Sequence, residues 1–301
     1  MTKFQKREGI MLAYPAEEKR IKAFPLLEIE DGSKQRSFFH QPKLNGERAR
    51  TEWFDNVPYL ISSYGNEFKF LSIIQRQLET LTKYLEKGNI LYDGEVYVHG
   101  WSREEVDSAL RRQTNKSNET QFLQYHIFDI QNTDPQYARL HLLGTIEQAV
   151  EHLELENIKV VPYGVCTEID WLSHCSSYCE EGYEGIILRS PFSSYEMKRI
   201  PGLLKFKPTE ADLYEIVAVN EAVSQEGELK GMVGSFTVKA KDEPGDHCTF
   251  DVGAGKLKHS QRIQYWQWKD KCIGQMLLVK HELLRTTNQV PIAAVTVDVV
   301  W

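Results

Sequence analysis

The sequence predicts an α+β protein of two domains. Its 301 residues are 41% hydrophobic, which leaves room for a sizeable buried core and for more than one domain. Up to about residue 207, helical periodicity alternates with strand-like runs, whereas residues 208–301 hold mainly short strands. We therefore expect a first α+β domain over residues 1–207 and a smaller β domain over residues 208–301.

Periodicity and capping residues mark the helices of the first domain. Apolar residues at helical spacing predict a helix over residues 71–85, and Ser102 with Glu105 forms a capping box that predicts another. Two more helices are predicted over residues 145–155 and 169–180. The strands predicted between them span residues 90–98, 124–130, 159–164, 185–189 and 203–207.

After Pro208 the pattern changes to short strands with glycine- and aspartate-rich turns. One helix is predicted near residues 260–269. The five strands are predicted over residues 214–219, 234–240, 248–252, 276–283 and 293–300. Five short strands with one helix are typical of a small barrel such as an OB-fold, which often binds nucleic acid.

Composition favours a cytoplasmic protein. Five cysteines, an odd number, are scattered without a disulfide-like framework or a secretory leader, so we expect the reducing cytosol. No run of 18 apolar residues occurs, and we expect no membrane insertion. His174, Cys175 and Cys179 have residue types that bind zinc, but they share helical spacing with apolar neighbours, which favours a helix core.

The net charge of −7 hides a basic region near the carboxyl end. Residues 256–285 carry seven lysines and arginines against two acidic residues, a local charge of +5. Lys256, Lys258 and Arg262 lie there beside several aromatic residues, a pattern that suits nucleic-acid binding. An amphipathic helix with a charged outer face explains the same pattern.

Lys43 lies in the most informative segment, residues 41–48. It follows a proline and precedes Gly46 and Arg48. One short segment therefore provides an amine that can act as a nucleophile, a glycine that lets the backbone approach a ligand closely, and a guanidinium that can bind an anion. A surface loop with an ordinary lysine would look the same. What distinguishes this lysine is the ordered set of charged residues that follows it along the chain.

Three later segments supply these charges. Asp93 and Glu95 lie in a predicted strand, and Glu184 stands at the start of another. Lys205 and Lys207 share one face of a third strand because side chains alternate with a period of two.

Together these segments resemble the covalent nucleotidyltransferases, and specifically ATP-dependent DNA ligases of the small, phage-like or viral type. The resemblance covers most of the chain, and Lys43, Gly46 and Arg48 match the family's nucleophile motif Lys-x-Asp-Gly-x-Arg. It implies an adenylation (nucleotidyltransferase, ATP-grasp-like) domain of antiparallel sheets with helices, followed by an OB-fold. It also implies a monomer that acts on nicked double-stranded DNA.

The resemblance also implies roles for individual residues. Lys43 is the nucleophile that takes AMP from ATP, and Lys205 and Lys207 stabilise the transferred phosphate. The implied nucleotide contacts come from Gln41 at the adenine edge, Phe128 stacking on adenine, Glu95 near the ribose, Arg48, and Glu184, which also holds Mg²⁺ or Mn²⁺. AMP then passes to the 5′-phosphate of a nick, and the 3′-hydroxyl displaces it to seal the strand.

Three departures from the family pattern stand out. Asn45 replaces the aspartate of the nucleophile motif, and Ser63 stands where an arginine is usual, so Arg50 is our candidate for holding the nick 5′-phosphate. The usual basic motif at the end of the chain is missing, and Lys280 or Arg285 is expected to replace it.

Two alternatives to a DNA ligase stay open on the sequence. An RNA ligase or RNA capping guanylyltransferase would share the nucleophile and the motif order. A non-catalytic nucleic-acid-binding relative is the alternative from a different class, and the missing terminal motif favours it while the intact Lys43, Glu95 and Glu184 do not.

Overall fold

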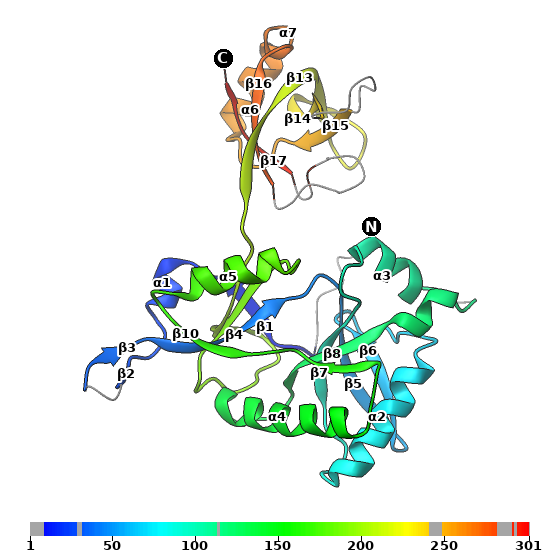
Figure 1. Ribbon diagram of the computed structural model, residues 1–301. Coiled ribbons are helices and arrows are strands. Elements are labelled where there is room, and N and C mark those ends of the chain that lie inside the picture. The colour runs from blue at the N-terminus through cyan, green and yellow to red at the C-terminus, as the bar shows by residue number, and fades with distance from the viewer. Residues whose placement is uncertain are drawn as a thin grey trace. The chain divides into compact units, whose positions relative to one another are not determined.

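A computed structural model describes residues 9–28, 32–112, 115–240, 249–281, 291 and 294–300. The chain divides into two compact units, Met1–Phe206 and Lys207–Trp301, and each is described by itself (Figure 1). The first unit contains two five-stranded sheets with helices, and the second is a closed barrel. The predicted mixture of sheets and helices is therefore confirmed.

The first sheet of unit one has the order β1-β12-β11-β4-β10. Its central strand pairs are antiparallel, and β1 runs parallel to β12. A separate two-stranded sheet joins β2 (Leu27–Glu28) to β3 (Lys34–Gln35). The strands of the first sheet are β1 (Leu12–Pro15), β4 (Ser37–Lys43), β10 (Gly164–Thr167), β11 (Gly185–Arg189) and β12 (Arg199–Phe206).

The second sheet of unit one has the order β6-β5-β7-β8-β9. Its strands are antiparallel except for β8 and β9, which run parallel. The strands are β5 (Glu47–Phe54), β6 (Val57–Ser62), β7 (Tyr92–Tyr97), β8 (Gln124–Ile130) and β9 (Ile158–Val160).

Helices cover the outer face of each sheet because alternate strand residues on that face are apolar. Beneath the second sheet the core includes Leu78 of α2, Val106 of α3 and Leu143 of α4, and α2 and α4 lie together in Figure 1. Beneath the first sheet, Ile21 of α1 and Trp171 of α5 pack against strand residues. The helices are α1 (Glu18–Ile21), α2 (Ser72–Leu85), α3 (Arg103–Leu110), η1 (Asn118–Phe122), α4 (Gln136–His152) and α5 (Trp171–Glu180).

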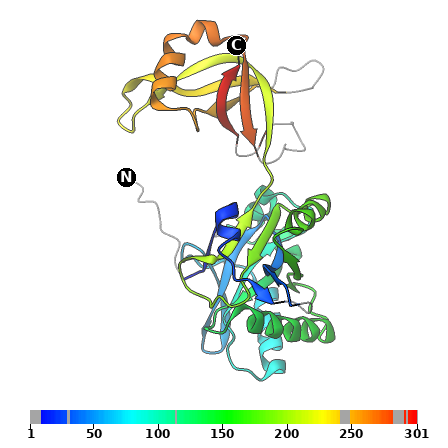
Figure 2. The ribbon, with the colours of Figure 1, turned by 90° about the vertical axis from the view of Figure 1, so that its left-hand side faces the viewer.

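The second unit closes into a barrel of order β13-β14-β15-β17-β16, whose strands curl around one core in Figure 2. Val238, Val252 and Leu277 fill the barrel, and Tyr265 of α6 packs against them. Its elements are β13 (Glu210–Val223), β14 (Leu229–Lys239), β15 (Thr249–Gly253), α6 (His259–Gln267), α7 (Lys269–Cys272), β16 (Met276–His281) and β17 (Val295–Val300).

Two predicted elements differ from the structure in an instructive way. The strand predicted over residues 159–164 is two strands, β9 and β10, which belong to different sheets. Pro162 lies in the link between them, and proline cannot donate the ladder hydrogen bond that one continuous strand would need. The helix predicted to begin at residue 145 begins earlier, at Gln136. Its first turns were missed because Gln136 and Arg139 are polar residues at buried positions and interrupt the apolar periodicity.

Some observed strands were not predicted, and others are longer than predicted. β4, β5 and β6, around Lys43, were not predicted as strands. In the barrel, β13 and β14 extend beyond the strands predicted over residues 214–219 and 234–240, and they pair as far as Val223 with Leu229. The capping box of Ser102 and Glu105 is confirmed at the start of α3.

The histidine and cysteine segment near residue 175 is confirmed as a helix core. Cys175 is buried in α5, and Tyr178 and Cys179 pack against the same core beneath the first sheet. In the part of the chain that the structure describes, no group of three or more His, Cys, Asp or Glu side chains could hold a metal ion. A search of the described residues also finds no helix long and apolar enough to cross a membrane.

Candidate active site

Lys43 is the last residue of β4, and its side chain meets an acidic partner from the neighbouring strand. Its ammonium donates to the carboxylate of Glu184, with both side chains mostly buried. The pairing of β4 with β11 sets this contact, because Lys43 lies opposite Gly185, the residue after Glu184. The backbone N–H of Glu184 also donates to the Lys43 carbonyl at 3.0 Å.

Strand register brings a second cation to the same face of the first sheet. Gln41 of β4 lies opposite Ile187 of β11, which lies opposite Lys205 of β12. Directly opposed residues share one face of a sheet, as do residues two apart on a strand. Gln41, Lys43 and Lys205 therefore project from the same face.

On the second sheet, Arg48 and Glu95 lie opposite each other on β5 and β7. Asp93 lies two residues before Glu95 and thus on the same face. The Asp93 carboxylate accepts from Arg48 Nε at 2.9 Å and from Nη2 at 2.5 Å, a bidentate contact that fixes the plane of the guanidinium. Tyr195 also donates to Asp93, at 2.6 Å.

Glu95 joins the second sheet to the turn after Lys43. Its Oε1 accepts from the Gly46 backbone N–H at 2.6 Å. Gly46 must be glycine here, since a Cβ at this position would lie 2.2 Å from the Val96 carbonyl oxygen. Burial raises the pKa of Glu95 to about 7; Lys43 and the Gly46 N–H oppose this rise, and Glu184 adds to it.

Phe128 is presented by an irregularity in β8. Gly94 pairs with Ile127 and Asp93 with Asp129, so the register skips Phe128. Its ring packs with Leu44, next to Lys43, and faces the guanidinium of Arg48 at 5.2 Å. The sequence indicated a strand aromatic here, and the skipped register explains how the ring leaves the regular ladder.

A buried polar network lies behind Phe128. Gln41 Nε2 donates to the Phe128 carbonyl at 3.2 Å, and Gln41 Oε1 accepts from Arg189 Nε at 2.7 Å. Arg189 also donates to Asp129 at 2.6 Å, and Arg139 donates to the other oxygen of Asp129 at 2.7 Å. Burial opposes the charge on Asp129, but the two arginines outweigh it and lower its pKa.

The structure thus brings together most of the residues predicted for the site. Arg189 and Asp93 were not among them, although both carry a sequence signal. Asp93 lies two residues before Glu95 on β7, and Arg189 lies two residues after Ile187, the strand partner of Gln41, on β11. Each therefore shares a strand face with a site residue or its partner. The residues brought together are Gln41, Lys43, Arg48, Glu95, Phe128, Glu184 and Lys205.

The remaining predicted residues are Lys207, expected to stabilise the phosphate, and the candidates for contacting the nick, the DNA or the leaving group. Arg50 donates to the Ser62 carbonyl at 3.1 Å and pairs with Glu52. Lys207 is the first residue of the second unit. In the barrel unit, Lys256 and Lys258 are exposed, whereas Arg262 donates to the Val233 carbonyl at 2.7 Å. Lys280 lies on β16, and Arg285 lies outside the described residues.

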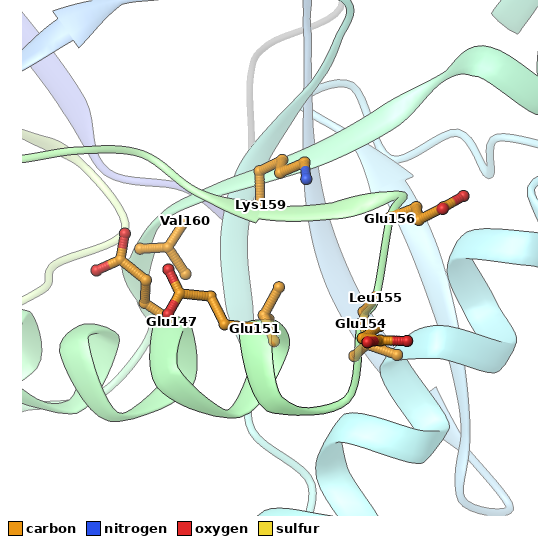
Figure 3. A pocket seen from close by; sticks show the side chains of 8 residues that line it. Glu147, Glu151, Glu154, Leu155, Glu156, Lys159 and Val160 are labelled. Carbon is orange, nitrogen blue, oxygen red and sulfur yellow. The ribbon is translucent and has the colours of Figure 1, made fainter.

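Two hollows on the first unit contain none of the predicted site residues. One, of about 260 Å³, lies between α4 and β9 and is lined by four glutamates with Lys159, Val150, Leu155 and Val160 (Figure 3). Glu147 and Glu151 share one side of α4 there, and burial followed by Glu151 raises the pKa of Glu147. The other, of about 530 Å³, lies beside Glu47 and Arg111.

A comparison with protein families decides the identity of this site. The family described as ATP dependent DNA ligase domain matches residues 11–207, the range that contains Lys43, Glu95, Glu184 and Lys205. The chain belongs to this family. The resemblance inferred from the sequence is therefore confirmed.

Named relatives agree with the family. A protein named DNA ligase from a Malawi tick isolate of African swine fever virus is 29% identical over 270 residues, covering 84% of this chain and 61% of the relative. The DNA ligase from a Namibian warthog isolate is 29% identical over 161 residues, covering 52% of this chain and 37% of the relative. The chain thus spans about three fifths or less of the length of these relatives.

Solved structures share the fold of the chain at low sequence identity. A structure from a study of DNA binding with a minimal scaffold by Lig E DNA ligases has a TM-score of 0.73 at 19% identity, covering 97% of this chain and 99% of that one. The structure named Pmar-Lig_PreS3 has a TM-score of 0.77 at 20% identity, covering 96% and 67%. The ATP-dependent ligase of bacteriophage T7, in complex with ATP, has a TM-score of 0.55 at 14% identity, covering 97% and 98%.

Proposed function

We propose that this chain is an ATP-dependent DNA ligase that seals nicks between a 5′-phosphate and a 3′-hydroxyl in duplex DNA. The observation that carries the proposal is the contact of Lys43 with Glu184, on the sheet face that also carries Lys205. The contact fixes the position of the Lys43 amine, and Lys205 supplies a second cation on the same face for the phosphate that the amine attacks.

In the proposed first step, the Lys43 amine attacks the α-phosphate of ATP. A nitrogen–phosphorus bond forms, the bond to pyrophosphate breaks, and the proton that the attacking amine loses passes to solvent, while the contact with Glu184 holds the amine in position. Lys205 and Lys207 stabilise the negative charge that develops on the phosphate oxygens. AMP is then attached to Lys43.

The same pocket serves the next two steps. The 5′-phosphate oxygen at the nick attacks the AMP phosphorus, and Lys43 leaves as the amine. The 3′-hydroxyl then attacks the 5′-phosphate, forms the new phosphodiester bond and releases AMP. Lys205 and Lys207 serve each transfer, since negative charge develops on a phosphate every time.

Nucleotide recognition is proposed for four further side chains. Phe128 would stack on adenine, and Arg48, oriented by Asp93, would bind the nucleotide. Glu95 would accept a ribose hydroxyl. Gln41 would read the adenine edge with its remaining amide hydrogen, because its other contacts are made to Phe128 and Arg189.

The acidic residues fit a divalent cation. Glu95 and Glu184 interact electrostatically, and this repulsion contributes to the raised pKa of Glu95. Oxygen ligands suit Mg²⁺ or Mn²⁺, so Glu184 would hold the ion directly or through water, with Glu95 beside it. Bound there, the ion would neutralise phosphate charge.

For the second unit we propose an OB-fold that binds DNA. Its closed barrel of five strands, with the helices α6 and α7 between the third and fourth strands, supports this assignment. Lys256, Lys258 and Arg262 would contact the DNA backbone. We further propose an adenylation domain over residues 1–207 and an OB domain over residues 208–301, acting as a cytoplasmic monomer; the described free cysteines suit that location.

Incubation with α-labelled ATP and Mg²⁺ or Mn²⁺ tests the proposal. Label should become attached to the chain, be lost in Lys43→Ala and remain in Lys83→Ala, which changes an exposed lysine of α2. The labelled protein should then transfer AMP to nicked DNA in preference to nicked RNA. No label with either metal would refute the enzyme, and labelling by GTP with transfer to diphosphate-ended RNA would favour the capping alternative.

A further inference from the structure

Two arginines, Arg103 at the start of α3 and Arg111 directly after its end, meet a single carboxylate, that of Glu47 on β5. Arg103 and Arg111 both pair with Glu47, and the Arg111 contact is 3.0 Å long. Asp107, one turn before Arg111, accepts from it at 3.2 Å. Arg103, Asp107 and Arg111 are each four apart and so form one stripe along α3 and its C-cap.

The carboxylate lies underneath and the guanidiniums face solvent. Glu47 is 8% exposed, whereas the side chains of Arg103 and Arg111 are 50% and 56% exposed. Burial, the largest single cause, would lower the pKa of each arginine, but Glu47 and Asp107 together raise both. This surface therefore presents cationic groups whose geometry is fixed from below, which favours binding of an anion with two or more oxygens.

The site lies close to Lys43 along the chain. Glu47 is four residues after Lys43, so their Cα atoms are at most about 14 Å apart. Along one DNA strand this corresponds to roughly four nucleotides at about 3.4 Å each. The hollow of about 530 Å³ beside Arg111 is also lined by Lys69 and by the turn residues Ser62, Tyr64, Gly65 and Asn66.

We propose that Arg103 and Arg111 bind the phosphate backbone of a DNA strand within about four nucleotides of the nick. This inference rests on the proposed ligase function. The two arginines would supply a phosphate contact in a chain that has Ser63 where an arginine is usual in the family. Arg50 is engaged by Ser62 and Glu52, whereas Arg103 and Arg111 present guanidinium N–H groups toward solvent. The pair takes no part in AMP capture.

Binding should be measured on the full chain with a nicked duplex that ends in a 3′-dideoxynucleotide, so that no sealing occurs. We expect Arg103→Gln and Arg111→Gln together to raise the Kd about tenfold and to reduce the salt dependence of binding by about one phosphate contact for each arginine. Formation of the Lys43 adenylate should be unchanged. Arg76→Gln, which changes an exposed arginine of α2, is the matched control.

A series of duplexes, each with one neutral methylphosphonate near the nick, locates the contact. One such position should weaken binding by the parent protein and should have no further effect in the double variant. Additive effects at every position, or an unchanged salt dependence, would overturn the proposal. A parallel loss of adenylate formation would also overturn it, because the pair would then act in AMP capture.

The single substitutions Arg103→Gln and Arg111→Gln guard against loss of folding. Each leaves one guanidinium on the buried Glu47, so melting temperatures should stay near that of the parent. If the parent forms no adenylate at all, the proposed ligase function fails, whereas the binding measurements still decide between a phosphate site and a structural ion pair.

Discussion

The two sheets of the first unit have the same number of strands but contribute different chemistry. The first sheet provides the lysines, with Lys43 and Lys205 on one face. The second provides the carboxylates Asp93 and Glu95 and the aromatic Phe128. Neither sheet alone carries both Lys43 and Phe128, so the candidate site depends on contacts that join the sheets.

These joining contacts differ in kind from the core packing. Each sheet has its own apolar core on its helix-covered face. The faces that meet are joined by buried polar contacts through Gln41, Arg189 and Asp129. Buried ion pairs are directional and costly to break, so they fix relative position more strictly than apolar packing does. Four substitutions test this comparison, from the largest expected effect to the smallest.

Removing the second cation of the first sheet should have the largest effect. Lys205→Ala should slow formation of the Lys43 adenylate by about 10²- to 10³-fold, because one charge that stabilises the phosphate is lost. Single-turnover labelling with ATP measures the rate. Lys198→Ala, an exposed lysine just before β12, is the control and should leave the rate unchanged. Equal rates for Lys205→Ala and the parent would remove Lys205 from the site.

Breaking the connection between the sheets should mainly cost stability. Arg189→Met leaves Asp129 with Arg139 alone and deprives Gln41 of its donor. We expect a loss of about 3–5 kcal/mol in the free energy of unfolding, measured with urea. Arg36→Met, which breaks a partly exposed pair with Glu168, should cost only about 1 kcal/mol. Similar losses would mean that the buried network does not join the sheets.

Glu95 should make the protein less stable as the pH rises. Its pKa is raised from 4.5 to about 7, so the folded state binds a proton that the unfolded state has released. This contribution is complete below about pH 4.5 and is lost as the pH rises through 7, by at most about 3 kcal/mol. Glu95→Gln should flatten that part of the stability profile. A profile parallel to that of the parent would contradict the assignment.

His40, on the first sheet, should act in the opposite direction and with the smallest effect. Burial, and then His174, lowers its pKa to about 4, so its stabilising contribution is lost as the pH falls from 6.5 to 4. We expect a loss of about 1–2 kcal/mol on acidification that is absent in His40→Phe, after allowance for partial solvation. Thermal melting at pH 4.5 and 6.5 measures it. His141→Phe, which changes an exposed histidine of α4, is the control.

Much of the fold could be predicted where a local pattern was sufficient. The helix over residues 71–85 and the strands over residues 124–130 and 185–189 have clear periodicity and lie where they were predicted. The missed strands β4 and β5 mix charged or polar residues with apolar ones, because one face of each carries site residues, whereas β6 contains Pro58, which is unusual inside a strand. A functional face disturbs the alternation on which strand prediction depends.

The sequence by itself determined the candidates for the chemistry: a lysine in a nucleophile-like motif, two later acidic segments and a lysine pair, in a fixed order. These follow from residue type and from spacing within one element. Only the tertiary structure decided that Glu184 contacts Lys43, that Asp93 holds Arg48, and that Arg50 is engaged while Arg103 and Arg111 face solvent. Such contacts join residues 12 to 141 positions apart, and several depend on strand register; local sequence patterns encode neither the long-range contacts nor the register.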